Sequence, residues 1–153
     1  MKMKILILII LIGIQFSAFA KDENNIPASN IIQLNRNPIK LKITIGSTVF
    51  TATLYNNPTA TAFKARLPFT VNMIELNGNE KYYDFPKAFP TNASLGGNIK
   101  IGDLMIYGNN VMVLFYKNVD TSYSYTKLGF IDNTHRLVSA LGSGNVVVKF
   151  ENY

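Results

Sequence analysis

The sequence predicts a mainly β domain, either a closed barrel or a sandwich, with about eight short strands and two short helices. Three observations support this. Apolar and polar residues alternate along several short segments, which is the pattern of strands with one buried face. Turn-forming Gly, Asn and Pro residues recur at intervals of roughly ten residues. Only two segments, one early and one late in the chain, have apolar residues near helical spacing.

Residues 1–20 have the features of a secretory signal peptide, so we exclude them from the fold. Lys2 and Lys4 precede a purely apolar run at 5–12, and a small-x-small cleavage pattern follows at 18–20. An uncleaved membrane anchor is the alternative, but the run is short for a span of about 20 residues. We therefore expect export to the periplasm or the cell exterior, with no membrane span after cleavage.

The mature chain has 153 − 20 = 133 residues, which is enough for one domain with its own core. Without the two leader lysines it carries 15 − 2 = 13 basic and 9 acidic residues, scattered with no long basic run. This pattern gives no indication of nucleic-acid binding. The chain has no cysteine, so packing must hold the fold together. Residues 21–37 are polar and rich in Asn, and we interpret them as a tether before a folded domain at 38–153.

The domain begins with a predicted hairpin and a helix. Polar and apolar residues alternate in KLKITIG at 40–46 and in TVFTATL at 48–54, and a Gly-Ser turn joins the two segments. Asn57 is suited to cap a helix whose first residue is Pro58. Pro68 cannot continue that helix, which must end before it.

The middle of the domain alternates strands and turns. A third strand is expected at 70–76, and an Asn-Gly turn then leads into EKYYDF at 80–85. We expect a loop at 86–97, because this segment holds two prolines and two glycines. The segment 98–110 predicts two strands around a Gly-Asp turn. VMVLFY at 111–116 is continuously apolar, which is typical of a strand covered on both faces.

The last part of the chain predicts two strands and the second helix. KLGFI at 127–131 and NVVVKF at 145–150 are the strands. Asn133 or Thr134 is expected to cap the short helix between them, and Gly142 to end it.

The segment 111–151 resembles the C-terminal half of cyclophilins, with VLFY, TKLGFI, HRLVSALG and VVVKF in the same order as that family's strands and second helix. The resemblance is closer still to the bacterial cyclophilin-like proteins, a divergent branch, and it covers nearly all of residues 39–151. It implies a closed eight-stranded β-barrel with a helix across each end. The landmarks of that branch include LYNNPTA at 54–60, LP at 67–68, EKY at 80–82, GDL at 102–104, LFY at 114–116 and SYSYTKLG at 122–129.

The same resemblance argues against ordinary cyclophilin catalysis. Prolyl isomerase cyclophilins carry an essential Arg on the third strand, beside a pocket of Phe, Met, Trp and His. Here the third strand has no Arg and the nearest one is Arg66, the chain has no Trp, and the cyclophilin His falls on Tyr125. Only Phe115 persists, at the place of the pocket phenylalanine. An Arg that donates to the substrate backbone helps to lower an amide-rotation barrier of roughly 20 kcal/mol.

We therefore expect a binding module without enzymatic activity, whose ligand is an extended peptide or a small molecule. One alternative is a peptidyl-prolyl isomerase with a rearranged site, in which tyrosine hydroxyls or Lys81 replace the Arg. A structural or assembly role of the barrel surface is the other. The oligomeric state stays open.

The segment TSYSYT at 121–126 is the main candidate for ligand binding. Tyr123 and Tyr125 share one face of a strand, but the apolar residues that follow occupy the other face, so we expect a loop or a bulge near Thr126. Tyrosines there can offer ring faces and hydroxyls to a ligand. The alternative is that they only cover the end of the barrel.

The remaining candidates are polar residues near turns. We expect a binding groove lined by Phe115, Tyr116, Tyr123 and Tyr125. Glu80 and Lys81 are expected at its rim, although a surface ion pair is the alternative for these two residues. His135 is the only histidine, and the carboxylates are scattered, so we expect neither a metal nor another cofactor. The full set of candidate ligand-binding residues is Asn56, Glu80, Lys81, Tyr82, Asp103, Phe115, Tyr116, Tyr123, Ser124 and Tyr125.

Overall fold

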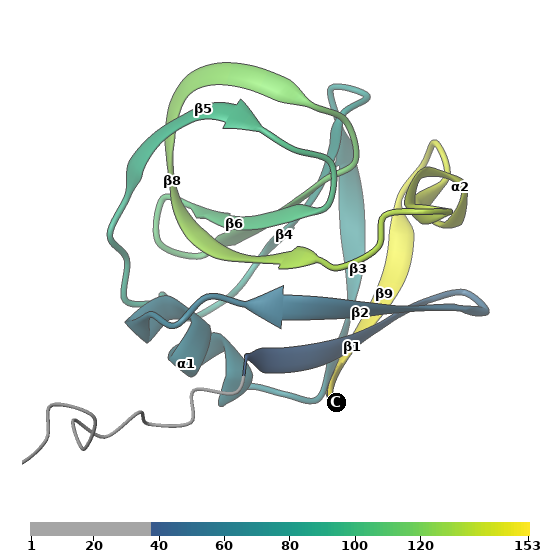
Figure 1. The fold of residues 1–153 in the computed structure, drawn as a ribbon, viewed down its shortest axis with the longest axis horizontal. Coiled ribbons are helices and arrows are strands. Elements are labelled where there is room, and N and C mark those ends of the chain that lie inside the picture. The colour runs from purple at the N-terminus through teal and green to yellow at the C-terminus, as the bar shows by residue number, and fades with distance from the viewer. Residues whose placement is uncertain (1–37) are drawn as a thin grey trace, which may run out of the picture. The chain divides into compact units, whose positions relative to one another are not determined.

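The computed structural model describes residues 38–153, and the predicted signal peptide and tether lie outside these residues. The described part consists of nine antiparallel strands and two short helices (Figure 1). The strands are β1 (Ile39–Ile45), β2 (Thr48–Leu54), β3 (Phe69–Leu76), β4 (Glu80–Asp84), β5 (Ser94–Ile99), β6 (Asp103–Tyr107), β7 (Val111–Phe115), β8 (Val119–Ile131) and β9 (Val146–Asn152); the helices are α1 (Pro58–Lys64) and α2 (Leu137–Leu141).

Eight of the strands form a closed barrel, which confirms the predicted fold class. Their order is β2-β1-β9-β3-β4-β7-β6-β8, and β8 pairs again with β2 to close the ring. β5 stays outside this ring and pairs with β8 alone, so the two strands form a ribbon that arches over one side of the barrel (Figure 1).

The barrel closes where β2 and β8 approach each other closely. Leu54 pairs with Gly129 at this seam. A Cβ atom at Gly129 would lie 2.4 Å from the Thr53 carbonyl oxygen, which is far inside van der Waals contact. Because that neighbour is backbone and cannot rotate away, glycine at this position is a condition of closure.

A single apolar core fills the barrel, and both helices contribute to it. The helices lie on opposite sides of the barrel in Figure 1. Phe63 of α1 is fully buried and packs edge-on against Phe69 and Phe150, with ring centroids 5.4 and 5.9 Å away. Leu137 and Leu141 of α2 belong to the same cluster. These contacts stabilise two helices that are too short to be stable alone.

The structure confirms the cap of α1 and corrects the cap of α2. The Asn57 side chain accepts a hydrogen bond of 2.8 Å from the Ala60 amide, as expected for an N-cap. Arg136 occupies the N-cap of α2 with φ 69°, and its side chain makes no capping bond. Asn133 instead accepts a bond from the His135 amide, so it stabilises the turn before the helix. Gly142 ends α2 with φ 62°, as predicted.

The predicted end of the loop at 86–97 is wrong, because β5 already starts at Ser94. The sequence contains little indication of this strand, because it has two glycines and its apolar and polar residues alternate only weakly. Its pairing with β8 shifts register between Leu95 and Gly97, which marks an irregularity in the ribbon. The strand expected from residue 98 is the end of β5, which stops at Ile99.

Candidate ligand-binding pocket

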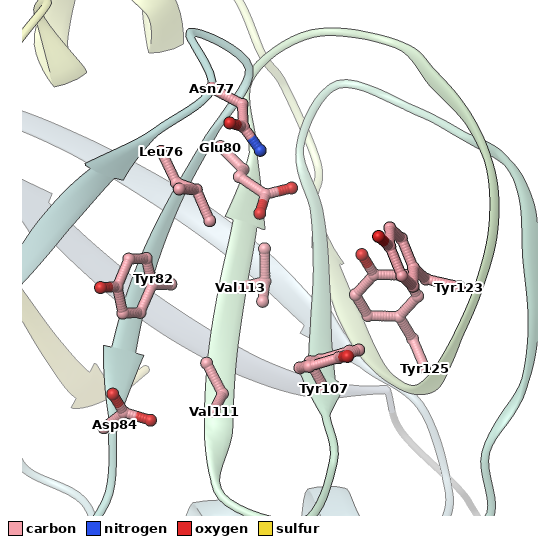
Figure 2. Close-up of a pocket in the computed structure, with 10 residues that line it drawn as sticks. All are labelled: Leu76, Asn77, Glu80, Tyr82, Asp84, Tyr107, Val111, Val113, Tyr123 and Tyr125. Atoms are coloured by element: carbon pink, nitrogen blue, oxygen red, sulfur yellow. The ribbon is translucent and has the colours of Figure 1, made fainter.

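A pocket of about 370 Å³ lies on the outer face of the barrel, beside the ribbon that β5 and β8 form. Four strands supply most of its walls: β4, β6, β7 and the first half of β8. Figure 2 shows the lining side chains on these neighbouring strands, with Tyr107, Tyr123 and Tyr125 grouped together on one side. They are Leu76, Asn77, Glu80, Tyr82, Asp84, Tyr107, Val111, Val113, Tyr123 and Tyr125.

The pairing register explains why these residues meet. Asp84 lies opposite Val111, Val111 opposite Tyr107, and Tyr107 opposite Tyr125, so one row crosses four neighbouring strands. A second row starts at Tyr82, which lies opposite Val113 on β7. Because side chains alternate between faces along a strand, residues two apart on β4 reach the same pocket.

Three tyrosines form one wall. The ring of Tyr107 lies 6.2 Å from that of Tyr123 in an edge-to-face arrangement and 5.6 Å from that of Tyr125. Tyr125 is buried, whereas Tyr123 is 64 % exposed and Tyr107 is 45 % exposed. Edge-to-face packing of this kind fixes ring orientations and leaves ring faces open to a ligand.

A small second core supports the tyrosine wall from below. Phe115 is fully buried, and its ring packs edge-to-face with Tyr125 at 5.7 Å. Ile99, Met105 and Val113 complete this cluster, which is separate from the barrel core. The position of Tyr125 therefore depends on packing contributed by β5, β6 and β7.

Burial and neighbouring charges shift the pKa of two residues that line the pocket. Burial raises the pKa of Glu80, and the nearby charge of Glu75 raises it further. Burial also raises the pKa of the Tyr125 hydroxyl to about 12, with further contributions from Glu80, Tyr107 and Tyr123. The tyrosine therefore stays protonated at neutral pH, while the Glu80 carboxylate is partly desolvated.

Comparison with known proteins decides the family. The model of the Cyclophilin-like family matches residues 43–151, most of the chain. The chain belongs to the cyclophilin-like family. No curated protein matches it significantly.

One solved structure matches the cyclophilin-like chain, the solution structure of a hypothetical protein from Archaeoglobus fulgidus. It is 18 % identical, with a TM-score of 0.48, and the match covers 76 % of this chain and 95 % of that one. The family membership therefore rests on the sequence match alone.

The structure brings together four of the sequence candidates in the pocket of this cyclophilin-like barrel: Glu80, Tyr82, Tyr123 and Tyr125. The expected change of face near Thr126 is present as a bulge. Leu104 pairs with Gly129, and the next residue of β6 pairs with Lys127, so Leu128 is an extra residue in β8. The tyrosines themselves lie on a strand and not on a loop.

The expectation that Lys81 lies at the pocket rim is wrong. Its side chain is fully buried, and its ammonium group forms an ion pair with Glu75. It also donates hydrogen bonds of 2.9 Å and 2.6 Å to the carbonyl oxygens of Gly142 and Gly144. Lys81 therefore joins the β3–β4 hairpin to the segment between α2 and β9. This role was hidden because a lysine beside a turn usually lies at the surface.

Tyr116 also points away from the pocket, contrary to expectation. It is buried in the barrel core, and its hydroxyl donates to the Glu75 carboxylate, with oxygen–oxygen distances of 2.8 and 2.9 Å. Burial raises the pKa of Glu75, but the hydrogen bonds from Lys81, Tyr116 and Gly78 lower it more, so the net pKa is depressed. Glu75, Lys81 and Tyr116 thus form a structural cluster.

The other sequence candidates lie outside the pocket. Asp103 accepts a hydrogen bond of 2.8 Å from the Lys100 amide and so stabilises its own turn. Asn56 and Ser124 are exposed and do not line the pocket. Phe115 supports the wall from below without lining it.

Six lining residues were missed by the sequence reading. For Asp84 a signal existed, because Glu80, Tyr82 and Asp84 follow each other at every second position of one strand. The sequence contains no such signal for Tyr107, because its contact with Tyr125 depends on the β6–β8 pairing register that the bulge sets. The other four are Leu76, Asn77, Val111 and Val113.

Arg66, the arginine nearest to the third strand, makes its contacts outside the pocket. Its guanidinium carbon lies 3.5 Å from the centroid of the Phe89 ring, and its nitrogens donate to the carbonyl oxygens of Lys87 and Ala88 at 2.9 and 2.6 Å. Within residues 38–153 no basic side chain lines the pocket. The same residues contain no metal-ligand group of three or more His, Cys, Asp or Glu, and no helix long and apolar enough to cross a membrane.

Proposed function

We propose that this cyclophilin-like barrel is a binding module that holds an extended peptide or a small molecule in the tyrosine-lined pocket. The observation that carries the proposal is the pocket itself: about 370 Å³, with ring faces on one wall and free polar groups on the other. Pockets of this size with a few convergent polar groups are the usual form of ligand sites.

A set of capped pentapeptides, Ala-Ala-X-Ala-Ala with the central residue varied, tests this proposal. The readout is the NMR shift of the tyrosine rings, with Tyr83 and Tyr153, which do not line the pocket, as internal controls. We expect at least one peptide to shift the rings of Tyr107 and Tyr123 and leave the controls in place. Tyr123→Ala should weaken that binding. If no peptide moves these rings at millimolar concentration, a peptide-binding role for this pocket is wrong.

We also propose that the chain is exported to the periplasm or the cell exterior. The support is the leader pattern: Lys2 and Lys4, the apolar run at 5–12 and the small-x-small pattern at 18–20. Expression of the full sequence in a bacterium, followed by intact-mass measurement of the exported fraction, tests this. We expect a chain that begins at Lys21. A full-length chain retained in the cell would contradict export.

A further inference from the structure

Two carboxylates in the described part of the chain have no partner, and both line the pocket. Residues 38–153 contain seven Asp and Glu side chains. Within these residues, Glu80 and Asp84 make no hydrogen bond and no ion pair. The other five all have partners: Glu75 with Lys81 and Tyr116, Asp103 with the Lys100 amide, Asp120 with Asn98, Asp132 with Lys40 and Thr53, and Glu151 with Lys42 and Lys149.

The negative charge of the pocket contrasts with the charge of the domain around it. Residues 38–153 carry 11 Lys and Arg against 7 Asp and Glu, so 11 − 7 = +4. Yet none of these basic residues lines the pocket, and the lysine next to Glu80 points to the opposite face of β4. The pocket therefore keeps two negative charges uncompensated.

The aromatic wall faces these carboxylates. Figure 2 shows Glu80 and Asp84 on β4 with Tyr82 between them. Val111 and Val113 lie on the neighbouring strand β7, and Tyr107, Tyr123 and Tyr125 lie beyond that strand. The face of a tyrosine ring carries partial negative charge and attracts a cation within about 6 Å. Carboxylates on one wall and ring faces on the other therefore favour the same kind of ligand group.

From this arrangement we propose that the pocket selects an organic cation, an alkylammonium or a guanidinium group on its ligand. The inference rests on the proposed binding function and names the ligand class for the same pocket. The apolar valines receive the aliphatic stem, the tyrosine rings cover the charged head, and Glu80 accepts its hydrogen bonds. Asp84, four residues further along β4, adds a second negative charge that attracts the cation. Binding of this kind supplies the counter-charge that the two carboxylates lack within the protein.

Other ligand classes fit these walls less well. An anion would be repelled by both carboxylates, and a neutral group without donors would bury them further without a partner. A calcium ion needs six or more oxygen ligands, and the described residues hold no group of three or more candidate ligands. The raised pKa of Glu80 agrees with a carboxylate that has been partly desolvated and still lacks its counter-charge.

The pentapeptide Ala-Ala-X-Ala-Ala gives a matched test. With X as lysine or arginine the peptide presents the cation, whereas acetyl-lysine and norleucine present a stem of similar length without the charge. Isothermal titration should show the lysine and arginine peptides binding about tenfold more tightly than the neutral pair. n-Butylammonium and n-butylguanidinium, tested alone, show whether the cation binds without a peptide. If the free cations bind as tightly as the lysine and arginine peptides, the ligand is a small organic cation and not a peptide side chain.

Glu80→Gln and Asp84→Asn remove the charges with little change in shape, and both side chains lie at the pocket surface. Each should reduce the preference for the cationic peptides several-fold while binding of the norleucine peptide persists. Asp120→Asn is the control, because Asp120 lies outside the pocket and the same charge is lost. Equal affinity for charged and neutral peptides, with the tyrosine rings still shifted, would overturn this inference and leave the binding module intact. If none of these probes shifts the rings, both proposals are wrong.

Discussion

Glu80 and Lys81 are neighbours in β4, yet their side chains lie on opposite faces of the barrel wall. Glu80 lines the outer pocket and has no partner there, whereas Lys81 is fully buried and ion-paired with Glu75. The alternation of side chains along a strand separates the two residues, so one carries the proposed binding charge and the other holds the fold. They therefore predict different consequences on substitution.

Lys81→Met should destabilise the protein by about 3 kcal/mol. The substitution keeps an apolar stem but removes the ammonium group that bonds Glu75, Gly142 and Gly144. The Glu75 carboxylate then loses its counter-charge and keeps only the bonds from Tyr116 and the Gly78 amide, and the two glycine carbonyl groups lose a donor. Urea unfolding at neutral pH measures the change in the free energy of unfolding.

Lys42→Met is the matched control, because Lys42 pairs with Glu151 at the surface with a nitrogen–oxygen distance of 3.0 Å. Exposed pairs contribute less than about 1 kcal/mol, so this variant should stay close to the parent protein. An equal loss in both variants would show that the burial of Lys81 adds nothing to stability.

Glu80→Gln should stabilise the protein at neutral pH. Burial and the charge of Glu75 raise the pKa of Glu80, so the folded protein holds this proton more tightly than the unfolded chain does. Ionisation of Glu80 therefore lowers stability as the pH rises through the folded pKa, and glutamine avoids that loss. Below the ordinary pKa of a glutamate, about 4.3, the two proteins should have similar stability. Urea midpoints across this pH range measure the difference.

Glu151→Gln should show the opposite sign. Hydrogen bonds from Lys149 and Lys42 lower the pKa of Glu151, so its ionised form contributes stability above the unfolded pKa and loses it as the pH falls through the folded pKa. This variant should therefore be less stable than the parent at neutral pH and match it in acid. If Glu80→Gln is destabilised at neutral pH as Glu151→Gln is, Glu80 does not carry an unfavourable charge in the folded protein.

The Tyr125 hydroxyl should titrate with a pKa of about 12, raised first by burial and then by Glu80 and the neighbouring tyrosines. The ring-carbon NMR signal of Tyr125 should stay unchanged at about pH 10, where an ordinary tyrosine is half ionised. Glu80→Gln removes one contribution, so the titration should move to lower pH. A midpoint at the ordinary value would mean that Tyr125 is more solvated than the pocket geometry requires.

Much of the barrel could be predicted because its strands alternate clearly. Leu41, Ile43 and Ile45 are fully or almost fully buried, as their spacing in β1 predicts. β5 could not be predicted in the same way, because its residues are mostly exposed and two of them are glycines. Its formation depends on β8, which lies more than twenty residues further along the chain. Pairing between distant segments leaves no local trace in the sequence.

The pocket was only partly predictable for a related reason. Tyr123 and Tyr125 were found because tyrosines cluster in one short segment, but Tyr107 joins them only through the β6–β8 register. Tyr116 was assigned to the wrong face, since a continuously apolar strand gives no indication of which side faces the barrel interior. Local composition therefore located one wall of the pocket, and long-range pairing supplied the others.

The cyclophilin-like domain should not accelerate prolyl isomerisation, in contrast to a catalytic cyclophilin. Catalysis needs a donor aimed at the substrate backbone, and within residues 38–153 no lysine or arginine lines the pocket. Arg66 stacks on Phe89 and bonds two carbonyl groups, and Lys81 is buried on the opposite face. The donors that line the pocket are the tyrosine hydroxyls and the Asn77 amide, and they carry no charge.

A protease-coupled assay on a succinylated Ala-Ala-Pro-Phe anilide, with a catalytic cyclophilin as the positive control, measures this. Each loss of about 1.4 kcal/mol in transition-state stabilisation lowers the rate tenfold, so a missing charged donor should bring the activity near the uncatalysed rate. A clear rate enhancement would contradict the prediction and identify a rearranged isomerase site. Tyr125→Phe would then show whether a tyrosine hydroxyl supplies the donor, because the substitution keeps the ring that packs on Phe115 and removes only the hydroxyl.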